Sequence, residues 1–226
     1  MVKLDFGVIL QRWPLFLDGM LLTIELSVIA TALGFVVGTL SAIGRRSGIA
    51  WLSRLSGAYV ELIRNTPLLV QVFLVYFGFS SVGMSLSAFT VALIALTINV
   101  GAYTTEIMRA GFDSIHRGQI EAAECLGLTR RQVYWHVVLR PAMEKVYPAL
   151  TSQFVLLMLA SSITSQISVE ELTAVAARVQ SETFRPFEAY ILVAVAYLIL
   201  SLLMRLGLWV FGQIVFTRKR KLGDAK

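Results

Sequence analysis

Residues 121–141 are Glu121-Ala-Ala-Glu-Cys-Leu-Gly-Leu-Thr-Arg-Arg-Gln-Val-Tyr-Trp-His-Val-Val-Leu-Arg-Pro141, a polar and basic segment between two long apolar stretches. Such a segment is predicted to be a loop with a fold of its own, held at one side of a membrane. Residues 119–126 favour a short helix. Gly127 follows directly and can leave that helix through the left-handed region without steric cost.

A second short helix is predicted after this glycine. Thr129 is a favourable N-cap, and Gln132 stands three residues later, which is the spacing of a capping box. The helix is predicted to end by Arg140, because Pro141 has no N–H with which to continue the hydrogen-bonding pattern. The segment is therefore predicted to be a helical hairpin.

This hairpin resembles the EAA coupling loop of ABC importer permeases. The family pattern has Glu-Ala-Ala, three residues, Gly, nine residues, an aliphatic residue, one further residue, and then Leu-Pro. The residues that match are Glu121, Ala122, Ala123, Gly127, Val137 and Leu139. Arg140 occupies the position of the family's proline, and Pro141 follows one place later. An ordinary helix-turn-helix between membrane spans is the alternative interpretation.

The composition is that of a membrane protein. Of the 226 residues, 57% are hydrophobic and only 15% are charged, and the mean hydropathy is +0.73. Soluble domains carry about 25% charged residues. The net charge of +6 does not indicate a nucleic-acid partner, because the Lys and Arg residues are clustered between the apolar stretches. The chain is therefore expected to contact membrane lipid and no nucleic acid.

Five membrane-spanning helices are predicted, so the expected fold class is an all-α integral membrane protein. Each apolar stretch is near the ~20 residues that cross ~30 Å of hydrocarbon, where helices satisfy their own backbone groups. The predicted spans are residues 20–43, 58–79, 87–108, 146–167 and 187–211. Small residues recur in the first span and predict close packing against another helix. They are Gly19, Thr23, Ser27, Gly34 and Gly38.

The charges of the loops predict the orientation. Thirteen Lys and Arg residues lie in the loops on one side and in the C-terminal tail, against four on the other side. The positive-inside rule therefore places the first group in the cytoplasm. The N-terminus is predicted to lie outside, and the C-terminus inside, the cytoplasmic (inner) membrane of a bacterium.

Two further segments resemble the permeases that import polar amino acids, a subgroup of the same family. Residues 61–71, Glu61-Leu-Ile-Arg-Asn-Thr-Pro-Leu-Leu-Val-Gln71, match the subgroup's ELxRxTPLLVQ, and residues 101–111 match its GAYxxEIxRAG. Pro67 is expected to kink the second span or to mark its start. The resemblance covers about residues 19–212. It implies a transmembrane domain at 15–212 with the coupling loop at 112–141, followed by a basic cytoplasmic tail at 213–226.

The third predicted span carries a row of polar residues. Asn99, Tyr103 and Glu106 follow steps of four and three, which place them on one helical face. A lipid-facing helix would not expose such a row, so the face is predicted to meet other helices or a watery cavity. Asn99, Tyr103 and Glu106 are candidates for substrate contact, and the alternative for Glu106 is a structural pair with Arg109 or Arg64.

The end of the fourth predicted span holds a second polar patch. Its candidate substrate-path residues are Ser161, Ser162, Ser165 and Gln166. Such residues favour a broken or cavity-lining segment near a transport path. A lysine that is usual here in the amino acid subgroup is absent, so a second permease subunit is hypothesised to supply the missing group.

The outer loop at residues 169–186 is expected to be a solvated face, with docking of an external binding protein as the alternative. It carries mixed charges, which are Glu170, Glu171, Arg178, Glu182 and Arg185. Charged side chains normally remain in contact with water.

No catalytic or metal-binding residue is predicted, because the chain lacks a Gly-x4-Gly-Lys-Ser/Thr phosphate loop and a His-Glu-x-x-His pair. No cofactor is expected on this chain. The resemblance implies that ATP and Mg are bound by two ATPase subunits, on which the hairpin, with Leu128 and Pro141, would dock. It also implies a second permease subunit, identical or homologous, and an extracytoplasmic amino acid-binding protein.

The predicted function is the permease subunit of an ATP-driven importer of polar amino acids, forming half of the translocation path. An ABC permease for another small polar solute, such as an opine, is one alternative. An ion-coupled secondary carrier is another, and it would transport without ATP.

Overall fold

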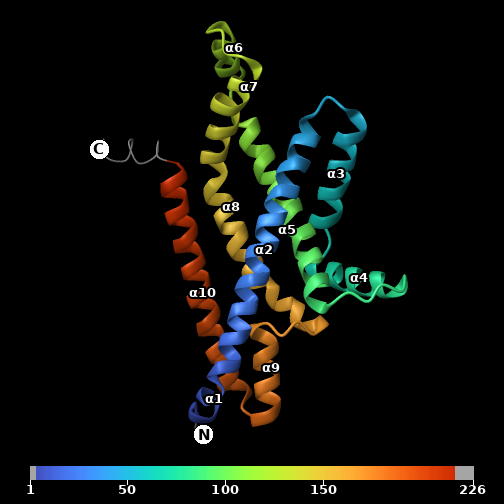
Figure 1. Ribbon diagram of the computed structural model, residues 1–226, viewed down its shortest axis with the longest axis vertical. Helices are drawn as coiled ribbons and strands as arrows, with labels where there is room; N and C mark the ends of the chain where they lie inside the picture. Colours follow the sequence, from blue (N-terminus) through green and yellow to red (C-terminus); the bar gives the residue numbers. More distant parts are fainter. Residues whose placement is uncertain (1–3, 217–226) are drawn as a thin grey trace.

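The computed structural model describes residues 4–216, and every regular element within them is helical (Figure 1). The predicted basic tail lies almost entirely outside these residues. The elements are α1 (Gly7–Leu10), α2 (Trp13–Arg46), α3 (Ala50–Arg64), α4 (Leu68–Ser81), α5 (Ala88–Asp113), α6 (Arg117–Cys125), α7 (Arg130–Gln132), the π-helix η1 (Val133–Leu139), α8 (Arg140–Ala160), the 3₁₀-helix η2 (Ser161–Ile167), α9 (Leu172–Thr183) and α10 (Pro186–Val215).

The all-α membrane fold is confirmed, with four long apolar helical runs among the described residues and a fifth, bent one. The straight candidates are α2, α5, the run Arg130–Ile167 and α10. The fifth is the pair α3 and α4, which meet at 110°. The second predicted span, residues 58–79, therefore lies in this bent pair, and the kink or helix start that the sequence predicts at Pro67 is present. Figure 1 shows α4 lying across the direction of the long helices.

The bend follows from Pro67, as the sequence predicts. Pro67 is extended, with φ −63° and ψ 138°, and it has no N–H, so the helix of α3 cannot pass through it. The bend leaves carbonyl oxygens of α3 without helical partners. The side-chain amide of Gln71 lies 2.7 Å from the Ile63 oxygen and 3.0 Å from the Thr66 oxygen. Gln71 thus satisfies backbone groups that lipid could not satisfy.

The first span packs closely against α5 through its small residues. A Cβ on Gly34 would lie 3.2 Å from the Thr97 carbonyl oxygen, and one on Gly38 would lie 2.6 Å from the Gly101 carbonyl oxygen. The two backbones can approach this closely only because no side chain separates them. The predicted packing role is therefore confirmed, and it fixes α2 against the helix that carries the polar row.

The hairpin forms as predicted at its tip. Gly127 has φ +76°, and α6 ends in a Schellman motif in which the Leu128 N–H donates to the Ala123 oxygen (3.2 Å) and the Gly127 N–H to the Glu124 oxygen (2.9 Å). The capping box of Thr129 and Gln132 is present at the start of α7.

The prediction that the second hairpin helix ends by Arg140 is wrong. The helix continues from α7 through η1 into α8, and Pro141 lies in the first turn of α8. The π turns shift the hydrogen bonds by one residue, so that the Arg140 N–H donates to the Trp135 oxygen. The missing N–H of Pro141 therefore falls where the bonding pattern changes from π to α. The hairpin and the fourth span form one helical run.

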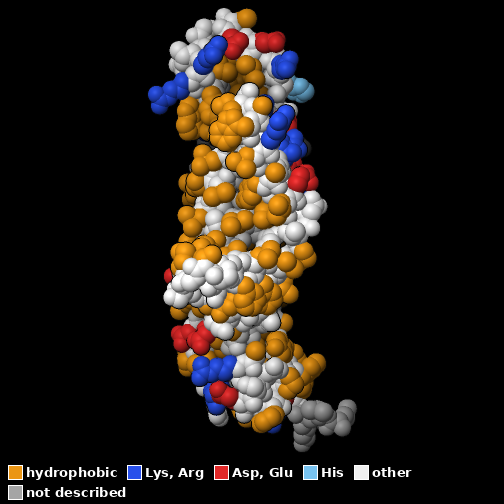
Figure 2. Space-filling view, turned by 90° about the vertical axis from the view of Figure 1, so that its right-hand side faces the viewer, with side chains coloured by type: hydrophobic (Ala, Val, Ile, Leu, Met, Phe, Trp, Pro, Cys, Tyr) orange, Lys and Arg blue, Asp and Glu red, His pale blue; other side chains and the backbone are white. Residues whose placement is uncertain are grey.

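The surface agrees with a membrane location. Figure 2 shows hydrophobic side chains over the middle of one face and charged side chains toward its two ends. Large apolar side chains exposed along α2 and α10 include Val28 (54%), Leu40 (64%) and Leu202 (56%). The buried core lies chiefly between α2, α5 and α8, with a second cluster where α9 packs on α2 and α10.

Candidate functional site

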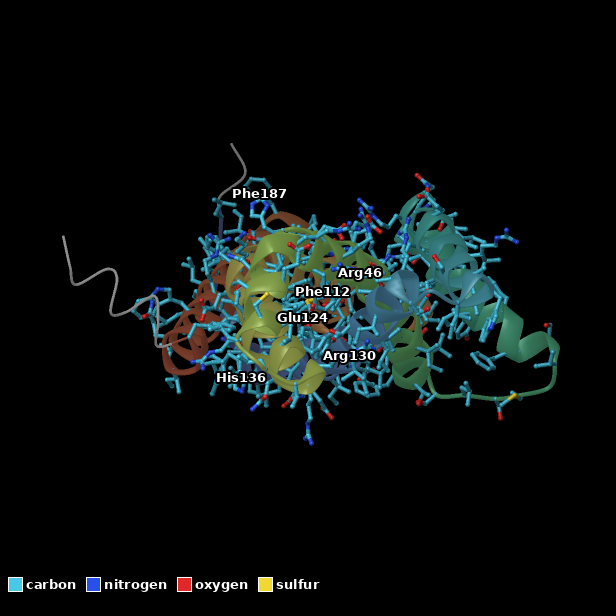
Figure 3. The ribbon with its side chains drawn as sticks, turned by 90° about the horizontal axis from the view of Figure 1, so that it is seen from above. Arg46, Phe112, Glu124, Arg130, His136 and Phe187 are labelled. Atoms are coloured by element: carbon cyan, nitrogen blue, oxygen red, sulfur yellow. The ribbon has the colours of Figure 1, made fainter. Side chains whose placement is uncertain are left out.

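The hairpin projects beyond the long helices at one end of the molecule (Figure 1). Seen from above, Glu124, Arg130 and His136 lie on the hairpin (Figure 3). Of the residues predicted for coupling, Glu121, Ala122 and Gly127 are exposed. Leu126 at the tip, whose side chain is 80% exposed, was not among the predicted residues.

The other predicted coupling residues lie on the inner side of the hairpin. Ala123 is buried, and it belongs to α6, which packs against η1. Half-buried positions are occupied by Leu128, Val137, Leu139 and Pro141. The motif therefore divides into residues that hold two short helices together and residues that are presented outward. A protruding, partly apolar surface of this kind is suited to a protein partner.

The polar row of α5 meets other helices, as predicted, and its first member is buried. Asn99 is 8% exposed and donates a hydrogen bond from Nδ2 to Oε1 of Gln71 (2.9 Å). The same Gln71 amide holds the bend at Pro67. In the sequence, Gln71 was recognised only as part of a motif. A glutamine four residues after a membrane-embedded proline is the signal that could have assigned it this role.

Tyr103 lies one turn further along α5 and borders a cavity of about 210 Å³ between α3 and α5. The cavity is lined by Val60, Glu61, Arg64, Asn65 and Tyr103. The Arg64 guanidinium carbon stands 5.4 Å from the centroid of the Tyr103 ring, which is a cation–π distance. A carboxylate, a guanidinium and an aromatic ring thus surround one small space.

Glu106 is the centre of an ion cluster. Its carboxylate pairs with Arg45 and with Arg109 (2.8 Å), and it lies 3.9 Å from Arg64. The predicted pairing with Arg109 and Arg64 is therefore confirmed. Three helices, α2, α3 and α5, contribute these four groups, so Glu106 ties their ends together.

Replacing Glu106 by glutamine is expected to lower the free energy of unfolding by about 2 kcal/mol. The change leaves three guanidinium groups without their shared anion, and the usual loss for a buried pair is reduced here because the arginines are partly exposed. Thermal unfolding in detergent measures the effect. The control is Asp113→Asn, because Asp113 also pairs with two arginines (3.6 and 2.9 Å) but its side chain is 49% exposed. An equal effect of both changes would contradict the central role of Glu106.

The serine patch forms the 3₁₀-helix η2, which continues α8 directly, so the fourth span changes its helix type here but is not broken, and the cavity-lining role stays a prediction. Its hydroxyl groups turn back onto the helix: Ser161 donates to the Met158 oxygen (2.7 Å), Ser162 to the Leu159 oxygen (2.8 Å) and Ser165 to the Ser162 oxygen (2.7 Å). Gln166 is exposed. The element η2 lies against α4 and α5, which brings the patch to the same side of the fold as the polar row.

Two charged residues of the outer loop differ from the expected solvated face, the half-buried Arg185 and the buried Glu171. Glu171 is fully buried, caps α9 by accepting from the Ala174 N–H (2.9 Å), and accepts from the Tyr197 hydroxyl (2.5 Å). Burial raises the pKa of the Glu171 carboxyl above its usual value. Glu170, Arg178 and Glu182 are exposed as expected.

Sequence comparisons place this chain among membrane transport proteins. The family model described as "Binding-protein-dependent transport system inner membrane component" matches residues 17–213. A probable glutamine ABC transporter permease protein, GlnM of Bacillus subtilis, is 37% identical over 90% of this chain and 94% of that protein. The nopaline transport system permease protein NocM of Agrobacterium fabrum is 34% identical over 91% of both chains.

The fold agrees with solved structures. A structure described as an amino acid ABC transporter with histidines superposes with a TM-score of 0.86 at 36% identity, over 94% of this chain and 99% of that chain. An inward-facing methionine ABC transporter, MetNI, gives a TM-score of 0.73 at 22% identity, over 91% of this chain and 98% of that one.

Proposed function

This chain belongs to the family of binding-protein-dependent transport system inner membrane components, and we propose that it forms half of the translocation path in an ATP-driven importer of polar amino acids. It is a multi-pass inner-membrane permease subunit and not itself a catalyst. The glutamine permease of Bacillus subtilis and the amino acid transporter structure support the substrate class, because each is more than one-third identical to this chain over most of its length.

The hairpin is proposed to couple this subunit to an ATPase. The observation that carries this role is the exposure of Leu126, at 80%, together with Glu121, Ala122 and Gly127 on an element that stands clear of the membrane spans. Two ATPase subunits, which bind ATP and Mg, would each receive one hairpin. The inner residues Leu128, Val137, Leu139 and Pro141 would keep the hairpin in one shape during the cycle.

The proposed mechanism is alternating access. Two permease subunits, identical or homologous, enclose the path, and an extracytoplasmic binding protein delivers the amino acid to its outer side. ATP binding favours one orientation of the helices and hydrolysis the other, because the nucleotide has different affinities for the two states. The candidate path residues are Asn99, Tyr103, Glu106, Ser161, Ser162, Ser165 and Gln166.

The proposed orientation places the hairpin and the C-terminus in the cytoplasm and the N-terminus outside. It is supported by the distribution of Lys and Arg, and by the arrangement in which α1 and the last turn of α10 lie toward opposite ends of the molecule (Figure 1). The domain division proposed from the sequence, with the transmembrane domain at 15–212 and the tail at 213–226, is retained.

Uptake by the complete importer tests this function. The permease, its ATPase and its binding protein are placed in vesicles, and labelled glutamine, histidine, cystine and the opine nopaline are offered with and without ATP. ATP-dependent uptake of one of the three amino acids is expected. Uptake at the same rate by this subunit alone without ATP would favour an ion-coupled carrier. Uptake confined to an opine would favour the second candidate, which the nopaline permease supports at 34% identity.

Replacing Asn99 by leucine is expected to raise the KM for uptake about tenfold. The change removes the amide that contacts Gln71, and the loss of one hydrogen bond to a bound polar substrate corresponds to roughly 1.4 kcal/mol. The measurement is the amino acid dependence of uptake in vesicles. Thr90→Val, at the exposed start of the same helix, is the control. An unchanged KM in Asn99→Leu would remove Asn99 from the proposed path.

A further inference from the structure

Arg205 is a basic residue inside a predicted span, and no ion partner for it is found among residues 4–216. Arg205 is exposed on α10, the most apolar of the straight candidate spans. The ion pairs found within residues 4–216 do not include it. An exposed arginine in a membrane helix requires an anion or water, because hydrocarbon cannot solvate its charge.

Arg205 borders a groove between α8 and α10. The groove has a volume of about 340 Å³ and is lined by Tyr147, Pro148, Thr151 and Ser152 on one side and by Arg205, Trp209, Gly212, Gln213 and Phe216 on the other. Figure 1 shows these two helices side by side. The Tyr147 side chain in this lining is held in place by α10. Its hydroxyl donates to the Leu208 oxygen (2.5 Å), and its ring stacks on Phe211 with the two ring centroids 6.4 Å apart.

The depth of Arg205 suits a lipid headgroup. The helix has 30 residues and is about 45 Å long, whereas the hydrocarbon layer is ~30 Å thick. If the helix is centred, about 7 Å extends beyond the hydrocarbon at each end. Arg205 precedes the last helical residue by ten positions, about 15 Å, and is therefore ~8 Å below the boundary. A guanidinium can extend from there to the phosphate level.

The neighbouring residues also fit the membrane boundary. Trp209 lies one turn nearer the end of α10, and tryptophan is enriched at the level of lipid headgroups. The sequence continues beyond the described residues with four consecutive basic residues at 218–221. Basic residues that follow a span attract anionic lipids in the adjacent leaflet.

We propose that the α8–α10 groove binds an anionic phospholipid, with its phosphate on Arg205 and an acyl chain along Tyr147 and Trp209. A guanidinium can bind two phosphate oxygens at once, and Gln213 in the same groove offers an amide donor. A net negative lipid fits better than phosphatidylcholine, whose own ammonium opposes Arg205. The groove contains none of the candidate path residues and no residue of the hairpin at 121–141, so the proposal does not depend on the function proposed above.

The test uses the complete importer in nanodiscs of phosphatidylcholine, with or without phosphatidylglycerol. Phosphatidylglycerol retained after repurification is counted by mass spectrometry, and the melting temperature is measured in both lipids. Arg205→Gln is expected to lower retention about tenfold and to abolish the increase in melting temperature that phosphatidylglycerol gives. Arg205→Lys should be intermediate. Arg54→Gln, which removes one exposed charge from α3, should behave as wild type.

Two results would overturn the proposal. The first is equal retention of phosphatidylglycerol by wild type and Arg205→Gln. The second is a drop in melting temperature of Arg205→Gln, relative to wild type, that is as large in phosphatidylcholine alone as with phosphatidylglycerol present. Such a drop would show that Arg205 pairs with a protein group of the complex. If Arg205→Gln does not assemble, Ser152→Trp replaces it, since this change fills the groove and leaves the charge. Retention of the lipid by an assembled Ser152→Trp complex would equally overturn the proposal.

Discussion

Gly127→Val is expected to reduce ATP-driven uptake at least tenfold while the subunit still inserts into the membrane. Gly127 has φ +76° and has open space around it, so the obstacle is the backbone conformation and not a clash with neighbours. The left-handed conformation costs an L-residue about 1–2 kcal/mol, and a β-branched side chain adds to this. The Schellman motif would open, and Leu126 and Glu121 would lose their fixed positions relative to α7.

The matched control for this prediction is Gly127→Asn. Asparagine adopts the left-handed region more readily than other non-glycine residues, so uptake should remain near the wild-type rate. Uptake and ATP hydrolysis are measured together in vesicles with the binding protein present. We expect Gly127→Val to lose the stimulation of ATP hydrolysis by the loaded binding protein along with uptake. Wild-type values of both in Gly127→Val would show that the shape of the hairpin tip does not matter for coupling.

Gly38→Leu is expected to lower the free energy of unfolding by about 3 kcal/mol or more, at the upper end of the effects of overpacking. A Cβ at this position would lie 2.6 Å from the Gly101 carbonyl oxygen and 2.5 Å from Cβ of Thr104. One of these atoms belongs to the backbone of α5, so the clash is relieved only by separating the two helices. Stabilities of about 5–15 kcal/mol are typical, which makes this a large fraction of the total.

The amount of folded subunit in the membrane and its thermal unfolding in detergent measure the effect of Gly38→Leu. Gly207→Leu is the control, because Gly207 also lies inside a membrane helix, but a Cβ added to it would meet no neighbouring atom within 4 Å. It should unfold at nearly the wild-type temperature. A Gly38→Leu protein as stable as the control would mean that α2 and α5 can separate without penalty, contrary to the packing described above.

The hairpin tip and the number of spans could be predicted because they depend on local chemistry. Gly127, Thr129 and Gln132 determine their own backbone geometry over a few residues, and the apolar stretches are set by the thickness of the membrane. The polar row of α5 was likewise recognisable from its helical spacing. These features need no knowledge of distant contacts.

The features that were missed depend on interactions across the fold. Pro141 was expected to end a helix, but the preceding π turns move the hydrogen bonds so that the helix continues. The kink at Pro67 was expected, but its size of 110° and the side chain that makes it possible, Gln71 on the far side of the bend, could not be predicted from the proline alone. Glu171 was expected in water, whereas it is buried against Tyr197, 26 residues away. Spacing along the chain does not reveal such partners.

The uninterrupted helical run from Arg130 to Ile167 has a mechanical consequence. The run joins the hairpin at one end to the serine-rich 3₁₀-helix η2 at the other, and it is about 57 Å long if it rises like an α-helix throughout. A tilt at one end of this run displaces the other end, because no loop lies between them to absorb the motion. In the proposed coupling, a movement of the hairpin on an ATPase would therefore reach the serine-rich end through one continuous stretch of backbone.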